Sequence, residues 1–219
     1  MRMLAVLGDY YHDARLLRKA LDRVLYSLRD QETIEQITID YLGPKQLDDA
    51  SFEEVDLIII ASENRINPEE EQVEKWMTEK IAKKIHQFVE NGGGFLAWHS
   101  GFACYDGVET YLDMLKGSFD YHPEKHVEVT YHIEDDLFLN KNIQDFSFID
   151  EHYFMHCDQD QTNVFLTSAS EYGEQVAGWY HELGEGKVCC VVPAHTEEGL
   201  LHDSTGEILN GSIEWLIKE

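Results

Sequence analysis

Residues 91–105 read NGGGFLAWHSGFACY, and this stretch is the most informative about the fold. Three glycines lead into the short apolar run 94–98, which is typical of a buried strand. Because the glycines precede a strand and not a helix, a tight turn is favoured over a phosphate-binding loop. The run ends directly in His99, Ser100 and Gly101. The sequence therefore places a histidine where the chain leaves a strand and must turn.

The rest of the first half alternates predicted strands with amphipathic helices. Residues 3–7 and 55–62 are apolar runs of the kind found in parallel sheets, and residues 14–28 carry apolar side chains at helical spacing. A second helix is predicted from an N-cap at Asn67 to Asn91, because a proline and three glutamates follow the N-cap. Its expected buried face consists of Val73, Trp76, Met77, Ile81, Ile85, Phe88 and Val89.

The second half is richer in strand patterns. Residues 126–133 alternate in polarity, and residues 175–195 read as two strands joined by a glycine-containing turn. A final helix is predicted to begin at Thr205. These elements predict a single α/β domain over residues 1–219, with a doubly wound, mostly parallel sheet and a β-hairpin in the C-terminal half.

Composition restricts the partners of the chain. Its 219 residues include 43 acidic and 17 basic side chains, for a formal net charge of −26. Such a surface repels phosphate backbones and anionic lipids, so we expect neither nucleic acid nor membrane partners. The four cysteines form no C-x-x-C pair, which argues against a disulfide framework or a zinc knuckle. With no signal peptide and no apolar stretch of 18 residues, a cytoplasmic location is expected.

Polar residues follow several of the predicted strands. His12 comes after the first strand, Glu63 after the strand at 55–62, and His195 after the last strand. Ligands of open α/β sheets bind beyond the carboxyl ends of the strands, so we expect these side chains to converge on one cleft. His195 and Glu197 also have the H-x-E spacing by which a carboxylate can orient an imidazole.

The segment Ala97-Trp98-His99-Ser100-Gly101 has the frame of a nucleophile elbow. In the pattern G-x-[SC]-x-G a sharp turn after a strand lifts the central side chain into the cleft. Here His99 takes the central place and Ala97 replaces the first glycine. A histidine that only caps the following turn is the alternative.

Several segments, in this order, resemble the trehalose-utilisation ThuA family, within the class I glutamine-amidotransferase-like superfamily. They are GGGFLAWHSG, LKGSFDYHP, IDEHYF, VAGWYHELGEGKVCCVVPAH and ILNGSIEWLI, and the resemblance covers most of residues 1–217. It implies a flavodoxin-like sheet with a cysteine at the elbow and an H-x-E pair downstream. Because His99 stands at the elbow and Cys104 lies five residues later, no thioester can form there. Glutamine amidotransferase activity is therefore not expected.

The positions and the resemblance together give a set of candidate site residues. Proposed catalytic residues are His99, His195 and Glu151, and the same three would hold a divalent metal such as zinc. Proposed substrate-binding residues are His12, Glu63, Tyr153 and His122. The other histidines, His126 among them, are not assigned to the site.

Two classes of function remain open at this point. The first is an enzyme of sugar utilisation, a hydrolase, lyase or isomerase acting on a disaccharide or keto-sugar by acid–base or metal-assisted chemistry. The second is a non-catalytic module that binds a sugar or a protein partner on an amidotransferase-like scaffold. Self-association into a homo-oligomer is compatible with both.

Overall fold

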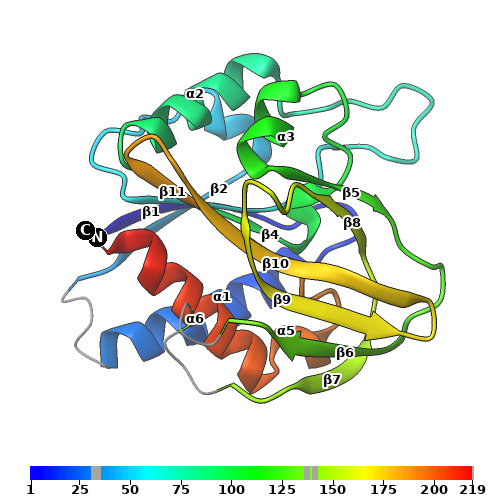
Figure 1. Cartoon of the computed structure of the whole chain (residues 1–219). Helices are drawn as coiled ribbons and strands as arrows, with labels where there is room; N and C mark the ends of the chain where they lie inside the picture. The colour runs from blue at the N-terminus through cyan, green and yellow to red at the C-terminus, as the bar shows by residue number, and fades with distance from the viewer. Residues whose placement is uncertain (31–35, 136–138, 140–142, 219) are drawn as a thin grey trace.

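The computed structural model describes residues 1–30, 36–135, 139 and 143–218. In this part of the chain nine strands form one sheet in the order β2-β1-β3-β4-β11-β10-β9-β6-β7, and two further strands, β5 and β8, pair separately (Figure 1). The strands are β1 (Arg2–Leu7), β2 (Thr38–Leu42), β3 (Leu57–Ala61), β4 (Gly94–Trp98), β5 (Gly117–Tyr121), β6 (Val127–Ile133), β7 (Phe146–Asp150), β8 (Phe154–Cys157), β9 (Asn163–Ser170), β10 (Gly173–Leu183) and β11 (Gly186–Val191).

The sheet has a parallel half and an antiparallel half. Strands β2, β1, β3, β4 and β11 pair in parallel, whereas β11, β10, β9, β6 and β7 pair antiparallel. The predicted α/β fold with its parallel core is confirmed, and so is the hairpin, which is formed by β10 and β11.

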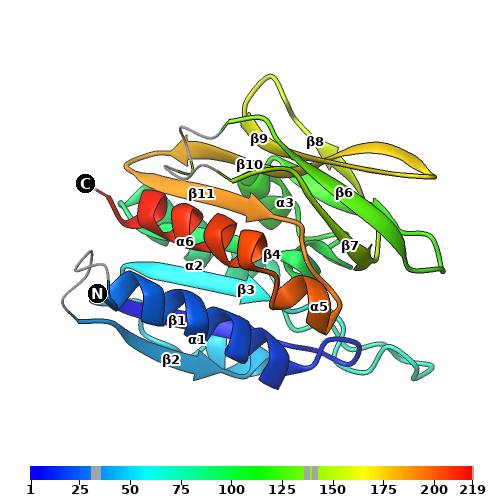
Figure 2. The same ribbon diagram turned by 90° about the horizontal axis from the view of Figure 1, so that it is seen from below.

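Helices cover both faces of the parallel half. Helix α1 (Ala14–Asp30) packs beside α6 (Asp203–Ile217) on one face, and α2 (Glu79–Glu90) packs beside α3 (Glu109–Leu115) on the other (Figure 2). The short helix α5 (Glu197–Leu200) precedes α6, and the 3-10 turns η1 (Pro44–Leu47) and η2 (His99–Phe102) follow β2 and β4. Within the described ranges, no helix is long and apolar enough to span a membrane.

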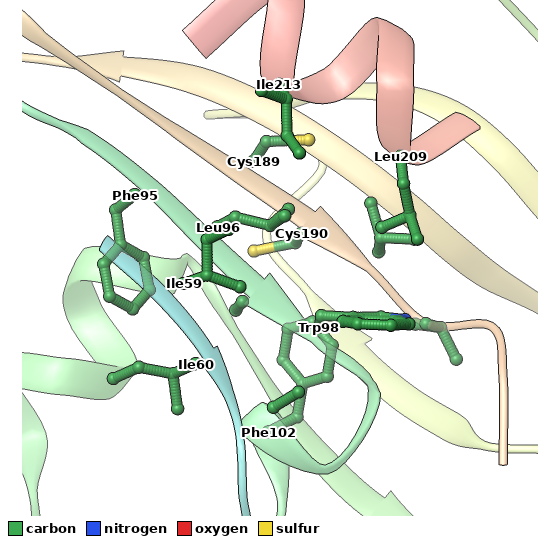
Figure 3. Packing of buried hydrophobic residues seen from close by; sticks show 14 of the residues in the cluster. Ile59, Ile60, Phe95, Leu96, Trp98, Phe102, Cys189, Cys190, Leu209 and Ile213 are labelled. Carbon is green, nitrogen blue, oxygen red and sulfur yellow. The ribbon is translucent and has the colours of Figure 1, made fainter. Parts of the chain in front are cut away.

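The core lies between the central strands and these helices. Every residue of β3 and β4 is buried, as expected for strands covered on both faces. The adjacent Cys189 and Cys190 point to opposite faces because successive strand residues alternate. Cys189 is directed toward Ile213 of α6 (Figure 3), and the Cys190 Sγ lies 3.9 Å from the Leu115 carbonyl at the end of α3. Both thiols are therefore inaccessible core groups.

The predicted helix start at Asn67 is wrong. Helix α2 begins at Glu79, and its N-cap is Thr78, whose side chain accepts a hydrogen bond from the Ile81 N–H. The Asn67 side chain instead accepts from the Glu74 N–H at 2.6 Å and so closes a loop. Of the expected buried face, Val73 is exposed, whereas Trp76 and Met77 are buried but precede the helix.

Candidate metal centre

A cavity of about 420 Å³ opens at the carboxyl edge of the parallel strands. In the strand order β2-β1-β3-β4, the connection from β1 runs to β2 on one side, whereas the connection from the adjacent β3 runs to β4 on the other. The two connections therefore diverge between β1 and β3, as at the ligand crevice of open α/β sheets. The cavity is lined by the loops after β1, β3, β4 and β11, by β5, and by the segments that follow β5 and β7. The lining residues are Tyr11, His12, Glu63, Arg65, Ala103, Cys104, Phe119, His122, Glu151, Tyr153 and His195.

His99 occupies the apex of the turn after β4. Its φ is +45°, a left-handed backbone conformation that few non-glycine residues adopt. The Nδ1–H must be the donor to the Val192 carbonyl at 2.8 Å, because a carbonyl only accepts. Nε2 is therefore the lone-pair nitrogen. Two residues later, a Cβ at Gly101 would lie 2.3 Å from the Ile60 carbonyl oxygen, so the turn needs a glycine there.

His12 is held by a carboxylate from its own loop. The His12 Nδ1 lies 2.6 Å from Asp9 Oδ1, while Asp9 Oδ2 accepts from the Glu63 N–H at 2.8 Å. Asp9 thus joins the loop after β1 to the loop after β3. Burial alone would raise the pKa of Asp9, but hydrogen bonds from His12 and from backbone N–H groups hold it below its usual value. An ionised Asp9 keeps the proton on Nδ1 of His12 and leaves Nε2 as an acceptor.

The segments that follow β11 and β7 place His195 and Glu151 in the site. The Asp150 carboxylate accepts from the His195 and Thr196 N–H groups at 3.0 Å, which ties β7 to the loop after β11. Burial raises the pKa of Asp150 to about 7. Glu151 Oε2 then lies 3.3 Å from His195 Nδ1 and 3.8 Å from His99 Nε2.

Four side chains consequently form one cluster. One ligand-type atom from each of His12, His99, Glu151 and His195 lies within 4.8 Å of all the others. In a tetrahedral zinc site with bonds of about 2.0–2.1 Å, ligand atoms are separated by about 3.4 Å, close to the two distances from Glu151. Three imidazole nitrogens, His12 Nε2, His99 Nε2 and His195 Nδ1, are buried without a hydrogen-bond partner among the described residues. The donor set fits a divalent ion.

The protonation states of His99 and His195 favour metal binding. Burial lowers the pKa of His99 well below its ordinary value, and the neighbouring His12 and His195 lower it further. Burial also lowers the pKa of His195, although Glu151 opposes the shift. Both imidazoles are therefore neutral near pH 7, the form in which histidine binds a metal.

The expected H-x-E pairing does not occur. Thr196 is the N-cap of α5, which places Glu197 in the first turn of that helix. The Glu197 side chain is 59% exposed and pairs with Lys19 at 3.3 Å. The carboxylate beside His195 is Glu151, from a different part of the chain.

Glu197→Gln should therefore leave the metal site unchanged. An exposed ion pair contributes about 0–1 kcal/mol, so we expect zinc affinity within about two-fold of wild type. A competition titration against a chromophoric chelator measures this affinity. A ten-fold loss would show that Glu197 orients His195 after all.

Other candidates lie around the cluster. The ring of Tyr153 stacks on His99 with centroids 4.5 Å apart, so it forms a wall of the site. The second oxygen of Glu151 lies 3.8 Å from His122 Nε2 and 3.6 Å from His126 Nε2. His126, which the sequence left unassigned, is thus part of the surroundings of Glu151.

Glu63 lies in the cavity but outside the cluster. Its Oε2 accepts from Arg65 Nη2 at 2.7 Å and lies 3.8 Å from Cys104 Sγ. Burial raises the pKa of Glu63, and Arg65 offsets part of the shift. Burial also raises the pKa of the Cys104 thiol to about 11, so it is not a thiolate nucleophile.

Sequence reasoning missed three neighbours of the site, and two had a detectable signal. Asp9 follows the first strand and precedes His12 by three residues, the spacing of a local side-chain turn. Arg65 stands two residues after Glu63. His126 had no distinguishing pattern, because only the pairing of β6 with β7, which sets Val127 opposite Asp150, brings it near Glu151.

Comparison with known proteins gives one family and one fold. The family model ThuA, described as trehalose utilisation, matches residues 8–216. A search of curated proteins finds no match. Among solved structures, the fold is similar to that of a ThuA-like protein from Bacteroides uniformis, with a TM-score of 0.72 and 14% identity over 99% of this chain and 91% of that one.

Two other solved structures have a similar fold. A protein from Salmonella typhimurium described as cytoplasmic gives a TM-score of 0.67 and 14% identity, over 100% of this chain and 99% of that one. A β-galactosidase from Bacillus circulans gives a TM-score of 0.61 and 13% identity, over 96% of this chain but 30% of that enzyme. At these identities the matches establish the fold alone.

Proposed function

Because this chain belongs to the ThuA family of trehalose utilisation, we propose that it is a sugar-processing enzyme that acts with a divalent metal ion such as zinc. The substrate would be a disaccharide or a keto-sugar derived from one. A cytoplasmic location is part of the proposal, supported by the fold's likeness to proteins described as cytoplasmic.

The observation that carries the proposal is a set of three imidazole nitrogens around one carboxylate, none of which has a hydrogen-bond partner within the described residues. A buried polar atom without a partner costs about 1–3 kcal/mol, so three in one place need an explanation. A metal ion would provide a partner for all three. A structural role for the histidines does not explain why each places its unpaired nitrogen toward the same point.

The residues of the site would have distinct roles. His12, His99, His195 and Glu151 would hold the ion, and Asp9 and the Val192 carbonyl would fix the orientation of two of the imidazoles. A bound divalent ion polarises a sugar carbonyl or hydroxyl and lowers the pKa of bound water. His122 and His126 would exchange protons with the sugar from the other side of Glu151. Tyr153 would shape the pocket.

Glutaminase activity is not part of the proposal. The elbow carries an imidazole, and the nearby Cys104 thiol has a pKa of about 11, so no activated thiolate is present at the turn.

The test is metal content measured together with sugar turnover. We expect about one zinc ion per chain after reconstitution, detected by elemental analysis. Turnover of trehalose or its keto derivative should disappear on chelation and return with zinc. A chain that binds no divalent ion, or whose sugar turnover is unaffected by chelation, would contradict the proposal.

A further inference from the structure

The cavity contains an ion pair that the metal cluster does not use. Glu63 has a 3% exposed side chain and pairs with the 31% exposed Arg65 at 2.7 Å. This bond occupies only one oxygen of the carboxylate and one nitrogen of the guanidinium. Glu63 Oε1 and Arg65 Nε are buried and have no hydrogen-bond partner within the described part of the chain. Both residues line the same cavity as His12, Glu151 and His195.

The pair is held in place by its backbone. The Glu63 N–H donates to Asp9 Oδ2 at 2.8 Å, and the Glu63 carbonyl accepts from Trp76 Nε1 at 2.7 Å. Trp76 is itself buried. Because Asp9 also holds His12, one carboxylate links the position of the ion pair to the metal cluster. A rigid polar pair at a fixed distance from a reacting centre is suited to ligand recognition.

Glu63 Oε1 and Arg65 Nε, the two atoms without a partner among the described residues, determine which ligand groups can bind. Oε1 accepts a hydrogen bond and Nε–H donates one, so the pair matches two neighbouring hydroxyl groups, one donating and one accepting. A phosphate or carboxylate group offers no donor for Oε1 when ionised.

The formal charge of the cavity also favours an uncharged ligand. Arg65 is the only cationic side chain among the described cavity residues, apart from the histidines, and Glu63 neutralises it. With a divalent ion bound, the formal charges of Asp9, Glu63, Glu151, Arg65 and the ion sum to zero. An anionic group beside Glu63 would be repelled without a free cation to compensate.

We infer that the Glu63–Arg65 pair is a specificity element that binds two adjacent hydroxyl groups of an uncharged sugar and rejects phosphorylated or acidic sugars. The inference rests on the proposed function, because it assigns the substrate class of the same cavity. It places the reacting end of the sugar at the metal cluster and a hydroxyl-bearing edge at the ion pair.

The experiment is calorimetry on the zinc-loaded protein with trehalose, methyl α-glucoside and trehalose 6-phosphate. Wild type should bind at least one neutral sugar and bind trehalose 6-phosphate at least about ten-fold more weakly than trehalose. Glu63→Gln and Arg65→Gln should each weaken neutral-sugar binding about 10–100-fold, because a buried polar partner is then left unpaired. Arg65→Lys, which keeps the charge but loses the planar donor set, should weaken it about ten-fold.

Matched controls are Glu197→Gln and Arg15→Gln, which alter exposed ion pairs with Lys19 and Asp13. Both should bind sugar as wild type does. The inference is overturned if wild type binds neither neutral sugar, if the phosphorylated sugar binds as tightly as trehalose, or if folded Arg65→Lys binds like wild type.

Zinc content, measured on the same samples, separates this inference from the proposed function. Sugar binding that depends on Glu63 and Arg65 in a protein without zinc would refute the metal function alone. Normal zinc content with sugar binding indifferent to both residues would refute the specificity element alone.

Discussion

His99→Gln is expected to lower zinc affinity at least about 1,000-fold and to abolish sugar turnover. Nε2 of His99 is buried and directed at the cluster, 3.8 Å from Glu151 Oε2. Removing one of four ligands loses a metal–nitrogen bond, a larger effect than the roughly 10–100-fold that follows loss of an outer-shell partner. Glutamine is chosen over alanine because its amide can still donate to the Val192 carbonyl and fills part of the ring volume.

The control is His86→Gln, which changes a histidine on α2 that pairs with Glu90 at 3.3 Å. Zinc affinity is measured by competition with a chromophoric chelator, and circular dichroism verifies that both variants are folded. His86→Gln should match wild type. A folded His99→Gln protein with wild-type zinc affinity would remove the elbow histidine from the metal site.

The parallel half of the sheet was predictable because its signals are local and strong. Short apolar runs such as residues 55–62 leave no polar face, which only a strand covered on both sides tolerates. His12, Glu63, His99 and His195 each follow a predicted parallel strand. They were therefore expected at one edge of the sheet, because the carboxyl ends of parallel strands share that edge.

The antiparallel half was less predictable. Glu151 reaches the cluster because β7, the edge strand of the antiparallel half, is tied by Asp150 to the loop after β11. No residue spacing in the sequence encodes that contact, and Glu151 was a candidate only from its position at a strand end and from the family resemblance. His126 was missed for the same physical reason, since its contact with Glu151 depends on the pairing of β6 with β7.

Two errors came from local patterns that fit more than one structure. Asn67 followed by proline and acidic residues resembles a helix start, but the same asparagine closes a loop by accepting from Glu74. His195 and Glu197 have a suitable spacing, but Thr196 between them caps α5 and places Glu197 at the surface. In both places the side chain that accepts the backbone hydrogen bond decides the structure.

Asp9→Asn is expected to weaken zinc binding about 10–100-fold without removing any ligand. Asp9 lies 2.6 Å from His12 Nδ1 and, as an ionised carboxylate, fixes the tautomer that leaves Nε2 unprotonated. Asparagine preserves the size and an acceptor oxygen, but its neutral amide makes His12 a weaker ligand and no longer selects one tautomer. Because Asp9 Oδ2 also accepts from the Glu63 N–H, the variant should loosen the connection between the loops after β1 and β3.

The matched control is Asp145→Asn. Asp145 pairs with His132 Nδ1 at 2.7 Å, the same type of contact, but 57% of its side chain is exposed and His132 is not in the cluster. Zinc affinity of Asp145→Asn should equal that of wild type, whereas Asp9→Asn should bind zinc stoichiometrically only at higher free zinc. Equal affinities in all three proteins would mean that His12 does not contribute to the metal site, which would leave His99, His195 and Glu151 as the ligand set. A loss of zinc affinity as large as that of His99→Gln would instead indicate that Asp9 maintains the whole cluster by joining the loops after β1 and β3. Hydrogen exchange at the Glu63 N–H would distinguish a separation of these two loops, which speeds exchange, from a weakened His12 ligand, which does not.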